Sequence, residues 1–142
     1  MKNLKLNSIH FVLMNYLGLI FIVFTFQYLR DIEWSWMFVA SEVFFITLFA
    51  ISFYFAYIKT KAWGFVHLSV KDLDERELIL VRKILRLSYA IFTIIALLIM
   101  LLLSITDMRI NIVFTVALIY FAHILPASIL VIMNGNSEVD EN

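Results

Sequence analysis

Four long apolar stretches, separated by polar segments, organise the chain. They run over residues 9–29, 36–58, 87–105 and 110–133. A helix that crosses a bilayer needs about 20 predominantly apolar residues. Lipid offers no hydrogen-bond partners to the backbone, which favours helices, and continuous apolar runs lack the alternation of a transmembrane β-strand. The pattern predicts an all-α membrane protein, a four-transmembrane-helix bundle that forms one domain over residues 1–142.

The polar segments between these stretches differ in length. The short connectors 30–35 and 106–109 predict antiparallel hairpins. Within the longer segment 59–86, residues 72–77 are rich in acidic side chains, and Arg82, Lys83 and Arg86 follow, an order that the helix dipole favours. Because no Gly or Pro lies between residues 72 and 106, we expect a helix over 72–86 that continues without a break into the third span. We expect a loop or short interfacial element over 59–71 and a mobile polar tail over 134–142.

Composition narrows the class of protein. Apolar residues make up 63% of the chain and charged residues 15%, against about 45–50% and about 25% in soluble domains. This excess excludes a soluble enzyme. Eleven basic residues balance eleven acidic ones, so the chain has no excess of positive charge with which to bind nucleic acid. The chain has no Cys, and its three histidines are too scattered for a metal or haem site. We therefore predict no metal, no cofactor and no catalytic residues.

The distribution of Lys and Arg predicts the orientation. With four spans, both termini and the segment 59–86 share one side. That side holds nine basic residues and the other holds two, Arg30 and Arg109. Short cytoplasmic loops are enriched in Lys and Arg. The sequence thus predicts that both termini are cytoplasmic and that the third helix extends into the cytoplasm.

One charged motif carries a resemblance. Leu73-Asp74-Glu75-Arg76-Glu77 precedes Leu87-Ser88-Tyr89-Ala90-Ile91-Phe92 at the start of the third span. This region, about 20 residues, resembles predicted small integral membrane proteins of bacteria that carry an L-D-E-R-E segment before a transmembrane helix and have no assigned function. The resemblance implies a bacterial inner-membrane protein and indicates no particular activity.

Glu42 is the first candidate for chemistry, because it lies six residues into the second apolar stretch. Intramembrane carboxylates usually face a bundle interior or a cavity. Glu42 is a proton- or cation-coupling group, a partner in an interhelical hydrogen bond, or a side chain that reaches the outer headgroups. Arg30 and Arg109 at the boundary could extend inward as ionic partners, with Arg109 favoured if the second and fourth spans touch. Polar residues at similar depth on the other spans could form a layer around it: Thr25, Gln27, Ser104, Asn111 and Thr115.

A second polar layer is expected near the middle of the bilayer, where each span carries one polar residue: Asn15, Ser52, Thr93 and His123. Polar side chains often join membrane helices by hydrogen bonds. The alternative is a polar path from Glu42 through His123 to the cytoplasm. Pro126 should kink the fourth span close to His123, because its ring clashes with the carbonyl four residues earlier.

Two function classes follow from these features. In the first, the protein is a non-enzymatic accessory or scaffold subunit that docks onto a larger membrane complex. Its docking helix would present five charged residues: Asp74, Glu75, Arg76, Arg82 and Arg86. In the second, the protein is a small transporter or channel, ion- or proton-coupled, that works as an oligomer and uses Glu42. The expected partners are membrane lipid and either another membrane protein or further copies of the chain.

Overall fold

The computed structural model describes residues 2–29, 36–106 and 110–136. The predicted connector 30–35, residues 107–109 of the second connector and tail residues 137–142 lie outside this part of the chain. The elements in order are α1 (Lys2–Leu29), α2 (Trp36–Phe53), the π-helical turn η1 (Tyr54–Ile58), α3 (Ala62–Val66), the 3-10 turn η2 (Val70–Asp72), α4 (Glu75–Thr106) and α5 (Ile112–Asn136).

The expected all-α fold class is confirmed, since the described residues contain helices and no strand. Four helices are long and apolar enough to cross a membrane: Ser8–Gln27, Trp36–Ile58, Glu75–Thr106 and Ile112–Asn134. Helix α4 is continuous but begins at Glu75, because Asp72 belongs to η2. Helix α5 extends to Asn136, so residues 134–136 of the predicted tail are helical.

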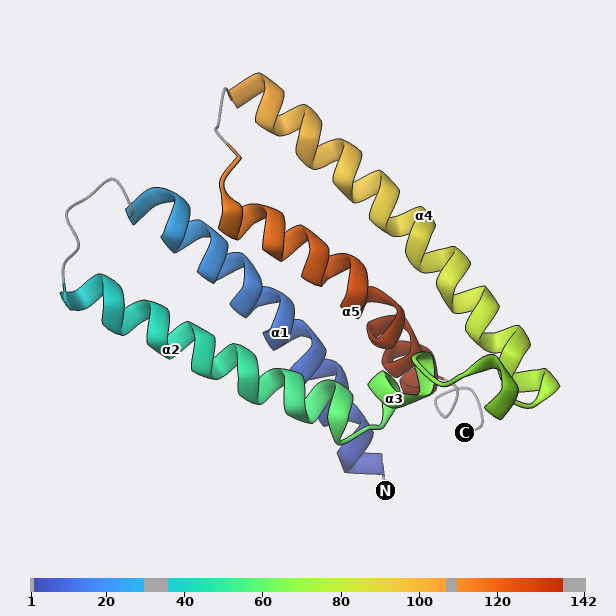
Figure 1. Ribbon diagram of the computed structural model, residues 1–142. Coiled ribbons are helices and arrows are strands. Elements are labelled where there is room, and N and C mark those ends of the chain that lie inside the picture. The colour runs from blue at the N-terminus through green and yellow to red at the C-terminus, as the bar shows by residue number, and fades with distance from the viewer. Residues whose placement is uncertain (1, 30–35, 107–109, 137–142) are drawn as a thin grey trace.

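The four long helices lie side by side (Figure 1). Helix α1 packs along α2 and α5, while α4 packs against α5. The start of α1, the short helix α3 and the last turns of α5 lie at one end of the bundle, which we call the α3 end (Figure 1). The close approach of α1 to α2 is at Gly18, where an added Cβ would lie 3.5 Å from Cβ of Phe49.

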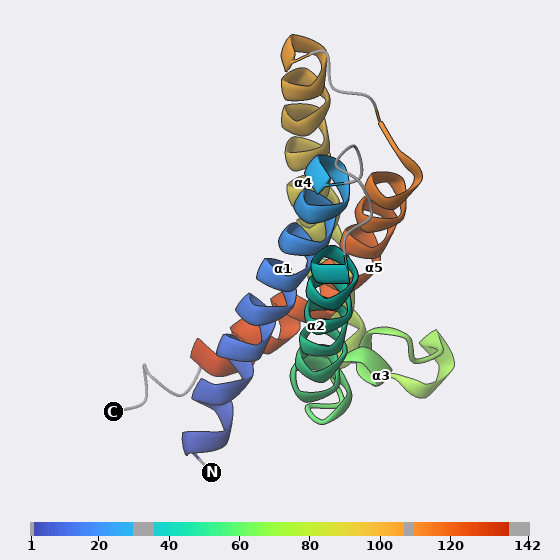
Figure 2. The same cartoon turned by 90° about the vertical axis from the view of Figure 1, so that its left-hand side faces the viewer.

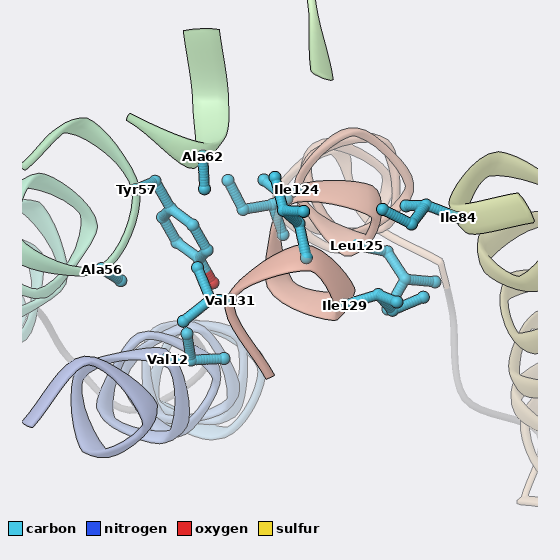
Figure 3. Close-up of a cluster of buried hydrophobic side chains, with 11 residues drawn as sticks. Val12, Ala56, Tyr57, Ala62, Ile84, Ile124, Leu125, Ile129 and Val131 are labelled. Carbon is cyan, nitrogen blue, oxygen red and sulfur yellow. The ribbon is translucent and has the colours of Figure 1, made fainter. Parts of the chain in front are cut away.

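The hydrophobic core lies at the α3 end and is centred on α5. Residues 124–131 of α5 are all buried. A helix that is apolar and covered all round belongs to a core. Figure 3 shows this segment between Val12 of α1, Tyr57 of η1, Ala62 of α3 and Ile84 of α4. One segment of α5 therefore holds the other elements together at this end.

Pro126 lies within this buried segment of α5. A proline inside a helix removes one backbone hydrogen bond and pushes away the preceding turn. The ribbon of α5 changes direction in this region, and its last turns run toward the start of α1 (Figure 2). The change of direction brings Ser128 to α1 and η1, where its hydroxyl meets Tyr16 and Tyr57.

Candidate functional site

Asn15 joins three helices through its side-chain amide. Its Nδ2 donates to Oγ of Ser52 at 3.2 Å and to the carbonyl of Phe49 at 3.3 Å. Its Oδ1 accepts a 2.8 Å bond from the hydroxyl of Tyr120 on α5. Asn15 and Ser52 are both fully buried. Each hydrogen-bonding atom of the Asn15 amide is thus used to hold α1 against α2 and α5.

Ser128 is the centre of a second buried network, next to the first. Its Oγ lies 2.7 Å from the hydroxyl of Tyr16 and 2.9 Å from that of Tyr57. The Ser128 hydroxyl also donates to the carbonyl of Ile124 at 3.1 Å. One arrangement satisfies all three bonds: Ser128 gives its proton to Ile124 and accepts a proton from each tyrosine. The network ties α5 to α1 and to the π-helical turn.

The two networks are adjacent because Asn15 and Tyr16 are consecutive on α1. Among the residues that the structure describes, every buried side-chain nitrogen and oxygen has a hydrogen-bond partner. Fully satisfied polar groups in an apolar interior fix one packing arrangement. The side chains of these two networks are therefore used for hydrogen bonding between helices.

The structure brings together two of the four residues expected in the middle layer, Asn15 and Ser52. Thr93 donates to the carbonyl of Tyr89 on its own helix. His123 is exposed and lies outside both networks. Sequence reasoning missed Tyr16, Tyr57, Tyr120 and Ser128. The signal for the tyrosines was available, because a phenol within an apolar stretch needs a hydrogen-bond partner when buried.

His123 belongs to an aromatic cluster with α3. The ring of His67 stacks on Trp63 with centroids 4.2 Å apart. The ring of His123 lies 6.0 Å from that of His67 and 6.2 Å from that of Trp63. His67 Nδ1 lies 2.8 Å from the carbonyl of Trp63, and a carbonyl oxygen can only accept, so Nδ1 is the donor of this hydrogen bond. The cluster attaches α3 to the side of α5.

Glu42 meets a residue of its expected outer layer. Oγ1 of Thr25 on α1 lies 2.5 Å from Oε1 of Glu42, which is half-buried on α2. Asn111 donates to Oε1 of Gln27 and also caps α5, since its Oδ1 accepts a 2.7 Å bond from the backbone of Phe114.

The other members of that layer are not joined to Glu42. Thr115 donates to the carbonyl of Asn111 on its own helix, and Ser104 is exposed on α4. The suggested ionic partners, Arg30 and Arg109, lie outside the described residues. Among the described residues, the outer polar layer thus forms one bond between α1 and α2 and another between α1 and Asn111, which directly precedes α5.

The L-D-E-R-E motif forms the N-terminus of α4. The backbone N–H of Glu77 donates to Oδ1 of Asp74 at 2.7 Å, and the N–H of Asp74 donates to Oε2 of Glu77 at 3.1 Å. This reciprocal pair is a capping box, which satisfies two backbone donors at the helix start. Asp74, Glu75, Arg76, Arg82 and Arg86 are all exposed.

A cavity of about 850 Å³ opens at the α3 end. Its lining comes from the start of α1, the continuous stretch from η1 through residues 59–61 to α3, the first turns of α4 and the last turns of α5. The lining residues are Ser8, Phe11, Phe55, Lys59, Thr60, Lys61, Ala62, Phe65, Glu77, Leu80, Leu130, Val131 and Asn134. Sequence reasoning did not predict this cavity, because four separate segments meet to form it.

Comparisons of this chain with protein families, with curated proteins and with solved structures found no match. Over residues 2–29, 36–106 and 110–136, no group of three or more His, Asp or Glu side chains is placed to hold a metal ion.

Proposed function

We propose that this protein is a non-enzymatic accessory subunit of the bacterial inner membrane, whose helix α4 docks onto a larger membrane protein. The four long apolar helices would cross the bilayer, with both termini and α3 in the cytoplasm. The nine basic residues assigned to one side support this orientation. The start of α1, α3 and the last turns of α5 share the α3 end (Figure 1).

The observation that carries the proposal is the isolation of α4. This helix has the most apolar stretch of the four, and none of that stretch is buried. Its two buried residues, Ile84 and Ser88, both lie in its first half. Beyond Ser88 it exposes a large apolar surface: Tyr89, Ile94, Leu97, Leu98, Met100, Leu101, Leu102 and Ile105.

Lipid could cover such an apolar surface. The way in which α4 packs in the bundle is a second argument for docking onto a partner. Helices α1, α2 and α5 are already joined to one another by the hydrogen bonds of the Asn15 and Ser128 networks. Helix α4 packs against α5 and makes at most isolated contacts with the other described elements. A spanning helix held on one side only is suited to insert between helices of a partner, where van der Waals packing drives association.

A photo-crosslinking amino acid tests this role. It replaces Leu98 on α4 or, as the control, Leu17 on α1; these side chains are 55% and 54% exposed. After crosslinking in the native membrane, mass spectrometry identifies the products. We expect a single larger membrane protein to be captured from position 98 and lipid alone from position 17. Lipid alone at both positions contradicts the accessory role.

The second candidate is an oligomeric transporter or channel that is ion- or proton-coupled and uses Glu42. The observation in its favour is a half-buried carboxylate that bonds to Thr25 inside the predicted span. Glu42→Gln keeps a side chain that can bond Thr25 but removes the charge. A transporter would lose proteoliposome flux in this variant and keep its expression, whereas an accessory subunit would keep its partner. Capture of only the chain's own copies from position 98 would favour this candidate.

A further inference from the structure

The cavity at the α3 end has a largely apolar wall. Leu130, Val131 and Ala62 are buried residues of the core and form apolar parts of its wall. Phe11 and Phe55 stack with ring centroids 4.9 Å apart and an interplanar angle of 18°. Phe65 and Leu80 add further apolar surface. A volume of about 850 Å³ lies within the range of about 300–1,000 Å³ typical of ligand sites.

Two lysines provide the positive charge of the cavity. Nζ of Lys59 lies over the ring of Phe55, 5.0 Å from its centroid. Lys61 lines the same cavity two residues later. Both side chains belong to exposed residues, so their ammonium groups are available to an anion that enters from the water side. An apolar wall with cations beside it matches a ligand that has a hydrocarbon part and an anionic part.

The backbone that carries these lysines is irregular. Lys59 closes the π-helical turn, with its N–H donating to the carbonyl of Tyr54 at 2.9 Å. Lys61 has φ 60° and ψ 9°, the left-handed conformation that glycine or asparagine adopts more readily. Lysine at this position costs conformational free energy, and such costs are often found at binding sites.

The position of the cavity indicates where its ligand comes from. Ser8 begins the first candidate span, Asn134 ends the last, and Lys59 directly follows the second. If these helices cross a bilayer, the cavity lies at the boundary between hydrocarbon and water. Phospholipid phosphates lie at that boundary, and lysines near it attract anionic lipids.

We propose that this cavity binds one anionic phospholipid, with an acyl chain against the Phe11–Phe55 wall and the phosphate between Lys59 and Lys61. The inference rests on the membrane location in the proposed function but not on the accessory role. Glu77 also lines the cavity and opposes an anion, but two lysines outnumber it. Its carboxylate is already engaged by the backbone of Asp74.

Native mass spectrometry of the purified full chain in detergent tests the proposal without any partner protein. The probes are dioleoylphosphatidylglycerol, which is anionic, and dioleoylphosphatidylcholine, which is zwitterionic. We expect one tightly held molecule of the anionic lipid, with at least fivefold weaker binding of the zwitterionic one. Equal binding of the two lipids overturns the proposal.

Matched variants separate the charge from the fold. Lys61→Asn keeps a residue that tolerates the left-handed backbone and should weaken binding of the anionic lipid about fivefold. Lys71→Asn removes an exposed lysine of η2 outside the cavity and should leave binding unchanged. Equal effects of the two variants overturn the site. If Lys61→Asn does not fold, Lys61→Gly makes the same test.

Glu77→Gln gives a change in the opposite direction. Glutamine can retain the capping bond to the N–H of Asp74 while losing its negative charge. We expect tighter binding of the anionic lipid in this variant. Weaker binding with an intact fold would contradict an anionic ligand in this cavity. These measurements use the isolated chain and need no partner protein. A negative result would therefore overturn the lipid site without affecting the docking role of α4, and a failure to capture a partner would leave the lipid site untouched.

Discussion

The imidazole ring of His67, which directly follows α3, stacks on that of His123 on α5, with centroids 6.0 Å apart and an interplanar angle of 28°. The two residues belong to segments that the sequence places at different depths, one after the second apolar stretch and one within the fourth. Their contact arises because α3 packs directly on α5, with Trp63 between the elements as a third ring. The 59–71 segment is therefore attached to the bundle at this point.

The His67–His123 contact predicts an efficient crosslink. The chain has no native Cys, so a His67→Cys, His123→Cys variant contains a single thiol pair. We expect mild oxidation to join the two positions in intact membranes, detected as a shift in electrophoretic mobility after cleavage between them. The control pairs His67→Cys with Ser104→Cys, which lies in the last turn of α4. Equal yields from the two pairs would contradict the packing of α3 on α5.

Ser128→Ala should destabilise the α3 end. The change removes the shared partner of the Tyr16 and Tyr57 hydroxyls in a buried environment. Leaving buried polar groups unpaired costs about 1–3 kcal/mol. The free energy of unfolding, measured by denaturant titration in detergent, should fall by about this amount. Ser88→Ala is the control, because buried Ser88 bonds to the carbonyl of Ile84 in its own helix. Similar losses in both variants would show that Ser128 has no special role.

Gly18 should tolerate one added carbon and no more. A Cβ there would make ordinary contact with Phe49 at 3.5 Å. Gly18→Ala should be neutral or stabilise by up to about 1 kcal/mol, since glycine lowers helix stability by about that amount. Gly18→Leu should push α1 and α2 apart and lower the thermal unfolding temperature. At Gly64, no described atom lies within 4 Å of an added Cβ, so Gly64→Leu is the matched control. An unchanged unfolding temperature in Gly18→Leu would contradict close packing of the helices.

Asp74→Ala should weaken the first turn of α4. It removes the acceptor for the N–H of Glu77, and loss of an N-cap costs about 0.5–2 kcal/mol. Amide hydrogen exchange over residues 75–80 should become faster while exchange over α1 stays the same. Asp72→Ala provides the control, because Asp72 belongs to η2 and lies outside the capping pair. Faster exchange after Asp72→Ala but not after Asp74→Ala would contradict the capping box.

The sequence determined the number, type and approximate limits of the long helices. These features depend on local properties: the length of an apolar run and the absence of Gly or Pro between residues 72 and 106. The start of α4 was displaced from residue 72 to Glu75 because Asp74 caps the helix. That displacement could also have been read from the sequence, since an acidic residue followed three positions later by Glu is a capping signature.

The tertiary structure decided which polar residues meet. Counting along straight helices placed Asn15, Ser52, Thr93 and His123 at one level, yet only Asn15 and Ser52 share a hydrogen bond among these four. The direction in which a side chain faces depends on how the helices rotate against each other, and a residue count does not contain that rotation.

Two departures from regular helix geometry account for the Ser128 network and the cavity, which sequence reasoning did not predict. Helix α5 contains Pro126 and changes direction along its length (Figure 2), and Ser128 beyond the proline reaches Tyr16. The π-helical turn directly precedes Lys59, which lines the cavity. The cavity is lined by four segments that are distant in sequence, which only the folded chain brings together. Local chemistry thus set the helices of this protein, while their bends and mutual packing set its polar networks and its candidate ligand site.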